Sequence, residues 1–306
     1  MPVIDQGTAP RESGDHERLG LYEEIFLGEA GGLTQFGVVI ETLQPGAASS
    51  DRHWHEAEDE FLMVLEGEAV LVENAGETLL APGDCVAWPK GTPNAHHLQN
   101  RADTPLRFIV AGWRAGRDVV HYPDHARRAV IAHGERVMEE GATAGPADLP
   151  GGKLDLAAAP VKTGSIYPEP YAAMMAGRSS LRLGHMGGLT QFGANLVRLE
   201  PGALASLRHW HENEDEFLIV TEGALALVDE DGTHPMAPGD CAAFPAGEAN
   251  GHHMTNPGNT PGAFLVFGTK APAEVAHYAD HDLRIEIEGG NARFTYRDGS
   301  PWDGPR

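Results

Sequence analysis

The sequence predicts an all-β protein built from two copies of one domain. The segment GGLTQFG occurs at residues 31–37 and again at residues 187–193, and the same offset of 156 relates many other segments of the 306-residue chain. Short runs of β-branched and aliphatic residues alternate with turn residues, including 38 Gly and 22 Pro, which is typical of many short strands. Because the offset holds without an insertion between residues 31 and 100, we infer that the halves arose by duplication.

The strands can be located within each half. Residues 60–73 (EFLMVLEGEAVLVE) and 216–230 (EFLIVTEGALALVDE) predict a strand, a glycine turn and a second strand. Residues 81–89 and 237–245 each place a Pro-Gly-Asp turn before a further short strand. Residues 125–140 (HARRAVIAHGERVMEE) are the best candidate for a helix, which we expect after the strands of the first domain.

The boundary between the domains is expected where regular patterns stop. Residues 141–160 are rich in Gly, Ala and Pro and have no apolar period, so they are predicted to be a linker. This places the domains at residues 1–140 and 161–306. Because a symmetric homodimer converts readily into a tandem chain, we expect the domains to pack about a pseudo-twofold axis, as a monomeric pseudo-dimer or within a homo-oligomer.

The charge excludes some classes of partner. The chain has 22 Lys and Arg against 45 Asp and Glu, a formal net charge of −23. Nucleic acids and anionic membranes are bound by clustered basic residues, so neither is an expected partner. No apolar run approaches the roughly 18 residues of a membrane span, and the N-terminal segment is polar, so we expect a cytoplasmic protein. The cysteines, Cys85 and Cys241, are expected to be small buried apolar residues.

Each half carries a cluster of potential metal ligands. In the first half, His53 and His55 are two residues apart, so on a strand their side chains point to one face while Trp54 points to the other. Glu60 opens the next predicted strand and shares its face with apolar residues that suit a domain interior. Three His and one Glu at fixed spacing, repeated in both halves, favour metal binding over isolated buried histidines.

The third histidine is one of two neighbours. His96 shares its face with apolar Leu98, whereas His97 would point outward beside polar Gln99. This favours His96 over His97, and in the second half His252 over His253, although both alternatives stay open. The predicted ligands of the second half are His209, His211, Glu216 and His252.

The donor types limit which metal can bind. Neutral imidazole and carboxylate form a mixed nitrogen and oxygen site that suits Mn, Fe, Ni, Co or Zn. The set contains no thiolate, which argues against a structural zinc site. We therefore expect a divalent metal ion in each half, two per chain, with coordination positions left for a small-molecule ligand or substrate.

The motifs around these residues resemble the two signature motifs of the cupin superfamily. They lie at residues 53–67 and 83–100 and recur in the second half, and the resemblance covers residues 31–125 and 187–283. It implies two tandem double-stranded β-helix (jelly-roll) barrels with the metals inside. The family pattern has a His where this chain has Asn94, and here the His follows two residues later. The motifs are more similar to those of small bacterial cupins than to those of oxalate decarboxylases, quercetin dioxygenases or seed globulins.

Other repeated residues permit more than one interpretation. Gln35 is expected either to line the pocket or to lie on the sheet surface, and Trp54 to pack on the outer face of its barrel. Residues 121–125 (HYPDH) are expected to pack against the neighbouring barrel rather than to bind metal. The acidic residues Glu56, Glu58 and Asp59 suggest a solvated turn, with a hydrogen bond from a ligand histidine to the carboxylate of Asp59 as the alternative.

Two functional hypotheses follow from these sites. The first is a metal-dependent enzyme, an oxygenase, decarboxylase or isomerase, acting on a small polar or aromatic carboxylate. The alternative is a non-catalytic binding or sensor protein that uses the metal to hold a small molecule. The fold cannot decide between them, and the sequence assigns no catalytic residue.

Overall fold

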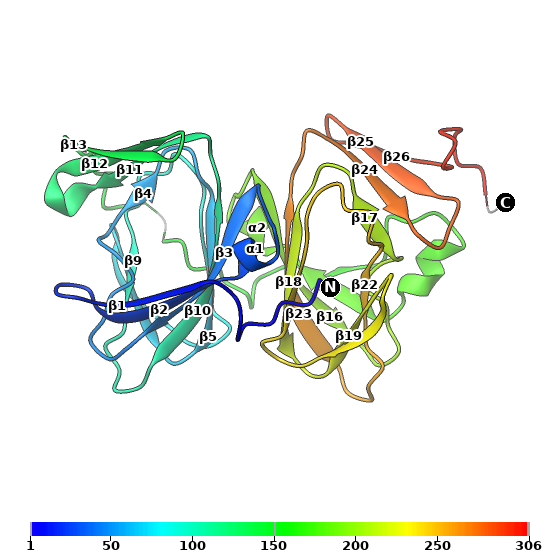
Figure 1. Cartoon of the computed structure of the whole chain (residues 1–306), viewed down its shortest axis with the longest axis horizontal. Helices are drawn as coiled ribbons and strands as arrows, with labels where there is room; N and C mark the ends of the chain where they lie inside the picture. Colours follow the sequence, from blue (N-terminus) through cyan, green and yellow to red (C-terminus); the bar gives the residue numbers. More distant parts are fainter. Residues whose placement is uncertain (1, 150, 305–306) are drawn as a thin grey trace.

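The computed structural model describes residues 2–149 and 151–304, which form two β-barrels side by side (Figure 1). The strands of the first half are β1 (Arg11–His16), β2 (Gly20–Phe26), β3 (Phe36–Leu43), β4 (Trp54–His55), β5 (Glu60–Glu66), β6 (Ala69–Glu73), β7 (Gly76–Leu80), β8 (Cys85–Trp88), β9 (His97–Gln99), β10 (Leu106–Trp113), β11 (Arg117–Tyr122), β12 (Arg127–Ala132) and β13 (Glu135–Glu140). Its helical turns are α1 (Leu27–Ala30) and η1 (Pro123–His125).

The second half repeats this order. Its strands are β14 (Lys162–Thr163), β15 (Arg178–Leu181), β16 (Phe192–Leu199), β17 (His209–His211), β18 (Glu216–Glu222), β19 (Leu225–Asp229), β20 (Gly232–Met236), β21 (Cys241–Phe244), β22 (His253–Thr255), β23 (Gly262–Thr269), β24 (Ala273–Tyr278), β25 (Arg284–Glu288) and β26 (Asn291–Thr295). Its helical turns are η2 (Tyr171–Met175) and α2 (Leu183–Met186), and none of the helices in the described part of the chain is long and apolar enough to cross a membrane.

Each barrel is made of three antiparallel sheets. In the first half a six-stranded sheet (β1-β2-β3-β10-β5-β8) is completed by a four-stranded sheet (β13-β12-β11-β4) and a three-stranded sheet (β7-β6-β9). The second half has the matching sheets β14-β15-β16-β23-β18-β21, β17-β24-β25-β26 and β20-β19-β22. The prediction of an all-β chain with two jelly-roll barrels is therefore confirmed.

The large sheets are buried on both faces. One face of β5 contributes Leu62 and Val64 to the interior of the first barrel, while the alternate residues Phe61 and Met63 point to the other barrel. The inter-barrel face is apolar because the two large sheets pack on each other there. At the centre of this interface Phe36 stacks on Phe192, its counterpart at the 156-residue offset, with ring centroids 5.8 Å apart.

Two aspartates join the barrels reciprocally. The carboxylate of Asp59 accepts hydrogen bonds from the main-chain amides of Thr190 and Gln191 in the other half. Asp215 does the same for the amides of Thr34 and Gln35, at 2.7 and 2.8 Å. These exchanged contacts are what a pseudo-twofold axis between the barrels produces.

The structure corrects two interpretations of this region. Asp59 is completely buried. It therefore does not lie in a solvated turn, because its carboxylate is enclosed by amides that need an acceptor. Gln35 is not among the lining residues of the cavity beside His53 and Glu60, and it does not lie on a free sheet surface. Its amide group donates to the carbonyl of Asn213, so it too belongs to the inter-barrel contact.

Segments that precede each barrel cover the edge of the other one. Residues 2–4 pair with β21, where the amide of Ile4 donates to the carbonyl of Cys241 at 2.9 Å. In the same way the amide of Leu154 donates to the carbonyl of Cys85 on β8 at 2.9 Å. Part of the predicted linker thus pairs with a strand edge, while the domain boundaries at 140 and 161 stay a prediction. Both cysteines are fully buried, as expected.

The helix predicted at residues 125–140 is absent, and this prediction is wrong. The segment forms the hairpin β12–β13, in which Ala132 pairs with Glu135. The two residues between them have positive φ, 53° for His133 and 79° for Gly134. This is the turn geometry that matches the twist of a two-residue hairpin. The turn and the pairing of β12 with β11 outweigh the helix-forming residues of the segment.

Candidate metal centres

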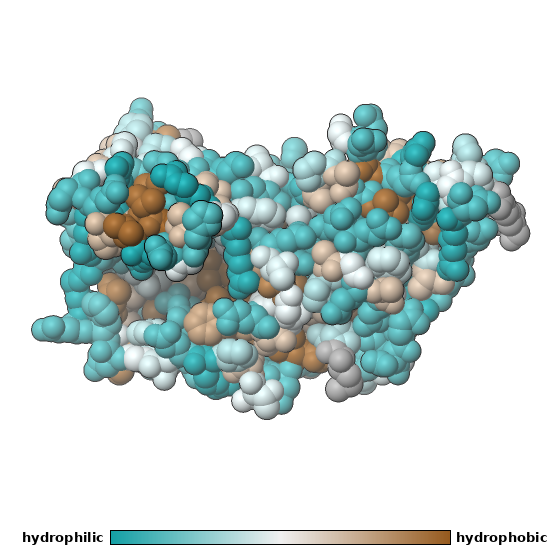
Figure 2. Space-filling model, turned by 45° about the horizontal axis from the view of Figure 1, so that its top comes forward, coloured by the Kyte–Doolittle hydropathy of each residue, from teal (hydrophilic) through white to brown (hydrophobic). Residues whose placement is uncertain are grey.

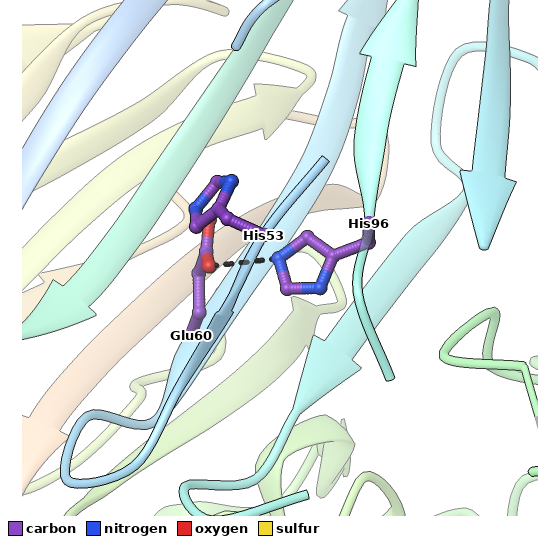
Figure 3. A group of neighbouring side chains, drawn as sticks. All are labelled: His53, Glu60 and His96. Atoms are coloured by element: carbon purple, nitrogen blue, oxygen red, sulfur yellow. Dashed lines mark hydrogen bonds and ion pairs between the residues drawn. The ribbon is translucent and has the colours of Figure 1, made fainter. Parts of the chain in front are cut away.

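The first candidate centre brings together three of the four residues predicted as ligands, His53, Glu60 and His96, and His55 lies beside them. The main chains of His53 and His96 pair with each other, through hydrogen bonds of 3.1 and 2.9 Å, which brings their imidazoles together. His55 ends β4, and Glu60 begins β5. Figure 3 shows His53, Glu60 and His96 turned toward a common point, with His96 Nε2 lying 3.0 Å from Glu60 Oε2. His55 Nε2 lies 4.0 Å from the same oxygen.

Each imidazole of this centre is held from outside through its Nδ1 atom. Nδ1 of His53 lies 2.9 Å from the carbonyl of Asp51, and Nδ1 of His96 lies 2.9 Å from the carbonyl of Asn94. A carbonyl oxygen can only accept, so Nδ1 carries the hydrogen in both rings. In the neutral form of each ring the lone pair is then on Nε2, and this is the arrangement that metal-binding histidines use.

The second centre has the same construction. His209 and His252 pair through their main chains at 3.0 and 2.9 Å, and their Nδ1 atoms lie 2.9 and 3.0 Å from the carbonyls of Leu207 and Asn250. Glu216 Oε1 lies 3.5 Å from His252 Nε2. His211 Nε2 lies 3.6 Å from Glu216 Oε2.

A cation fits these donors. Nε2 of His252 is buried and has no hydrogen-bond partner in the described part of the chain. An orphaned buried nitrogen is costly unless a ligand occupies it. It is flanked by the partly buried carboxylate of Glu216 and by two more imidazoles, and this combination of donors is complementary to a divalent metal ion and to few other groups.

The electrostatics of the first centre favour the same occupant. Burial lowers the pKa of His53 to about 3, and the neighbouring His55 and His96 add to this effect. Burial alone would raise the pKa of Glu60, but the charge of His96 and its hydrogen bond outweigh burial and lower it to about 2. His53 is therefore neutral and Glu60 ionised at neutral pH, which are the forms that coordinate a cation.

Two carboxylates that the sequence analysis missed hold the remaining histidines. Asp118 on β11 lies 2.7 Å from Nδ1 of His55, and Glu274 on β24 lies 3.3 Å from Nδ1 of His211. Burial lowers the pKa of His55, but the hydrogen bond to Asp118 outweighs burial and raises it. In the second centre the hydrogen bonds to Glu216 and Glu274 likewise outweigh burial and raise the pKa of His211 to about 10. A carboxylate at the same offset in both halves was the available signal.

His97, the alternative to His96, lies outside the first candidate centre. Nδ1 of His97 lies 2.8 Å from the carbonyl of Ser50, and its Nε2 lies 3.1 Å from the side-chain amide of Gln99. His96, by contrast, is 3% exposed and stacks on Trp88 with ring centroids 3.7 Å apart. This geometry supports His96 as the candidate ligand.

The HYPDH segment has a different partner from the one expected. His121 stacks on Trp54 at 4.2 Å, and its Nε2 lies 2.8 Å from Glu56 Oε1. It therefore packs within its own barrel, and the expected contact with the neighbouring barrel is wrong. Trp54 is buried on the outer side of β4, where its indole N–H donates to the carbonyl of Thr143 at 2.8 Å.

The first centre lies in the wall of a cavity of about 120 Å³. His53, Glu60 and His96 form one side of it. The remaining lining residues are Glu41, Ser49, Ser50, Leu62, Trp88, His97, Leu98, Phe108 and Val110. The cavity is thus mainly apolar, with a few polar groups close to the candidate ligands, as expected for a small-molecule site.

Comparisons with known proteins agree with this architecture. The cupin domain model matches residues 39–112 and again residues 195–268. A crystal structure described as a sugar phosphate isomerase from a cupin superfamily, from Silicibacter pomeroyi, is 57% identical over 49% of this chain and 96% of its own, with a TM-score of 0.49. No curated protein matches the chain.

Two larger structures share the fold at low identity. Oxalate decarboxylase from Lactobacillus farciminis is 17% identical, covers 88% of this chain and 86% of its own, and has a TM-score of 0.56. Salicylate 1,2-dioxygenase from Pseudaminobacter salicylatoxidans is 17% identical, covers 77% and 71%, and has a TM-score of 0.51. The repeated domain match, together with two barrels in one chain, identifies this protein as a two-barrel member of the cupin superfamily.

Proposed function

We propose that this protein is a metal-dependent enzyme that acts on a small carboxylate in the N-terminal barrel. The observation that carries the proposal is the convergence of two imidazoles, His53 and His96, and the Glu60 carboxylate at the wall of a cavity, with Nε2 of His55 lying 4.0 Å from the same carboxylate. The residues proposed to hold the metal are His53, His55, Glu60 and His96, with His209, His211, Glu216 and His252 holding a second metal in the other barrel.

The donor set suits Mn, Fe, Ni, Co or Zn in the divalent state. When bound, such a metal supplies a Lewis acid that polarises the oxygen atoms of a substrate. The protein contributes orientation, because the Nδ1 hydrogen bonds fix each ring. The apolar walls formed by Leu62, Phe108 and Val110 limit the access of water.

The size and lining of the cavity indicate the substrate class. Drug-sized ligands occupy pockets of roughly 300–1,000 Å³, so a cavity of about 120 Å³ suits a molecule of only a few carbon atoms. None of its lining residues is Lys or Arg. A phosphorylated sugar would need cationic side chains around its phosphate, whereas one carboxylate can be bound by the metal alone. This favours a small carboxylate.

The test begins with elemental analysis of protein purified without chelator. Protein loaded with Mn(II) or Fe(II) is then assayed with oxalate, malonate, oxaloacetate and salicylate, by gas evolution, oxygen uptake and product analysis. His96→Ala is expected to lose the N-terminal metal and all turnover. His185→Ala, at an exposed histidine, is the matched control and is expected to behave as wild type.

The outcomes separate the enzyme from a binding protein. If the loaded wild type turns over none of these compounds but still binds one of them with a measurable Kd, the non-catalytic alternative is favoured. If His96→Ala keeps both the metal and the activity, the proposed ligand set is wrong.

A further inference from the structure

A row of three glutamates runs across the first barrel toward the cavity. Glu12 on β1 pairs with Glu24 on β2, and Glu24 pairs with Glu41 on β3. Glu41 in turn lies opposite Phe108 on β10. Residues directly opposite each other on neighbouring strands share a face, and like charges at such positions destabilise a sheet. The row therefore destabilises the sheet unless its carboxyl groups are protonated.

The innermost member of the row faces the cavity. Glu41 is 7% exposed and lines the same cavity as His53 and Glu60, while β10 separates its strand from β5. In the described part of the chain its carboxyl group has no hydrogen-bond donor, so nothing in the fold uses it. An unpaired carboxyl buried at a ligand cavity is available to a bound molecule.

The surroundings favour a protonated group. Burial raises the pKa of Glu41 well above its usual range, and the charges of Glu24 and Glu60 raise it further. Burial also raises the pKa of Glu24, with the charge of Glu12 adding to it. Glu12 is exposed, and its Oε1 accepts a hydrogen bond from the hydroxyl of Tyr22 at 3.0 Å. The row thus leads from solvent to the buried end.

The second barrel shows that the fold does not need these carboxyls. There the corresponding row is Lys162, Ser180 and Val197, and Val197 pairs with Phe264 as Glu41 pairs with Phe108. The strand pairing is unchanged, but no acidic residue is present in this row. Since duplication gave both barrels one scaffold, the glutamates are a special feature of the first.

The interior of the first barrel is also more accessible than that of the second. In the second barrel, Tyr171 and Met175 of η2 are buried against Ile285 of β25 and close that side of the barrel. In the first barrel the matching hairpin leaves Val137 and Met138 exposed, at 54% and 46%. Figure 2 shows this half hollowed beneath an apolar patch, whereas the other half has a filled surface in the same view.

We propose that Glu41 is the acid–base residue for a substrate in the N-terminal cavity, and that Glu24 and Glu12 exchange its proton with solvent. The inference rests on the proposed function and narrows it to reactions that transfer a proton to carbon. In a decarboxylation, the bond between the carboxylate carbon and its neighbour breaks, carbon dioxide leaves, and the electron pair stays on the neighbouring carbon. That carbon takes the proton of the Glu41 carboxyl group, and Glu41 regains a proton through Glu24 from solvent.

The first test does not depend on turnover. Infrared spectra of the Mn(II)-loaded protein at pH 7 are compared for wild type, Glu41→Gln and Val197→Gln, the last being the matched change in the second barrel. We expect a protonated-carboxyl band in wild type and in Val197→Gln, and a weaker band in Glu41→Gln at unchanged metal content, because Glu24 and Glu214, whose pKa values are also raised, keep part of the signal. A wild-type spectrum without the band, or a band of unchanged intensity in Glu41→Gln, overturns the proposal.

The second test uses the carboxylates named above. Glu41→Gln is expected to lower kcat about 100-fold or more with little change in KM, because proton transfer rather than binding is lost. Val197→Gln is expected to leave kcat unchanged. If Glu41→Gln is as active as wild type, the proton-transfer role is wrong while the proposed function stands. If wild type itself turns over none of the compounds, the proposed function fails, and this role fails with it.

Discussion

Nδ1 of His55 lies 2.7 Å from Oδ2 of Asp118, and the other oxygen of this carboxylate accepts the main-chain N–H of Ala57 at 2.8 Å. Asp118 therefore fixes both the ring of His55 and the turn that follows it. In the second barrel Glu274 takes this place with one more methylene, and its distance to Nδ1 of His211 is 3.3 Å. Carboxylates behind a ligating histidine orient it and raise its basicity.

Removal of this support is expected to weaken metal binding at the first site. Asp118→Asn should lower the affinity of the N-terminal site roughly 10- to 100-fold, because the amide no longer stabilises the orientation and charge of His55. Competition with a metal-binding dye measures the change. Asp118→Glu, which copies the second barrel, is the control and should lose less. An Asp118→Asn protein with two sites of wild-type affinity would contradict this role.

Metal content tests the ligand sets directly. Because each barrel holds a His–Glu–His cluster with a further histidine beside it, we expect two metal ions per chain in protein purified without chelator. His55→Ala should halve this content, and His55→Ala combined with His211→Ala should abolish it. Circular dichroism checks that the variants keep their β structure. A full metal complement in the double variant would show that other residues bind the metals.

The repeat and the ligand candidates could be predicted from the sequence because both are local patterns. His53 and His55 are two residues apart on a strand, and their copies recur at a constant offset. The face that each strand presents follows from the same alternation, which is why Glu60 was expected in the interior. The duplication strengthens the prediction of metal ligands, because four pairs of ligand-type residues at one constant offset are hard to explain by chance.

The remaining site residues depend on contacts between distant segments. Asp118 reaches His55 only because β11 pairs with β4, and Asp59 is buried only because the second barrel supplies amides for it. Glu41 stands in a mainly apolar strand, and only the register shows that it adjoins Glu24. No local pattern contains this information. The hairpin at residues 127–140 was missed for the same reason.

The inter-barrel aspartates are expected to contribute strongly to stability. Asp59→Ala leaves the partly buried amides of Thr190, Gln191 and Lys90 without their acceptor, at a cost of about 3 kcal/mol in the free energy of unfolding. Asp103→Ala, at an exposed site, should stay within about 0.5 kcal/mol of wild type. Denaturant unfolding measures both. If the two variants are equally stable, Asp59 does not make this contribution to the stability of the protein.

The cysteines provide a test that depends on pH. Burial raises the pKa of both Cys85 and Cys241 from 9.0 to about 12. A raised pKa lowers the thiolate fraction at a given pH, here about a thousandfold at pH 8, and only the thiolate reacts with iodoacetamide. Alkylation of the native protein should therefore be very slow at pH 8 and should accelerate with rising pH. The unfolded protein is the control. Rapid native labelling at pH 8 would show that a thiol is accessible.

Removal of the metals should lower thermal stability at pH 7. A metal that binds only the folded state stabilises it by roughly 2.7 kcal/mol per site when its free concentration is 100 times Kd. EDTA is therefore expected to lower the Tm, and His55→Ala to show about half of the decrease. The donors are three imidazoles per site, and free imidazole has a pKa of about 6.5, so protons compete with the metal as the pH falls.

This competition sets the direction of the pH effect. Coordination needs neutral imidazole, whereas the hydrogen bonds that raise the pKa of His55, and that of His211 to about 10, favour the protonated rings in the empty sites. Release should therefore be complete by roughly pH 4 and be steep because several protons act together. The decrease in Tm caused by EDTA should therefore be largest at pH 7–8 and should vanish toward pH 4, where acid has already emptied the sites. Melting curves with and without EDTA, alongside metal analysis at each pH, measure this. If EDTA removes both metals at pH 7 and the Tm does not change, the barrels fold independently of the metals. The stability claim would then be wrong, while the ligand assignment would still rest on the metal analysis of the His55 and His211 variants.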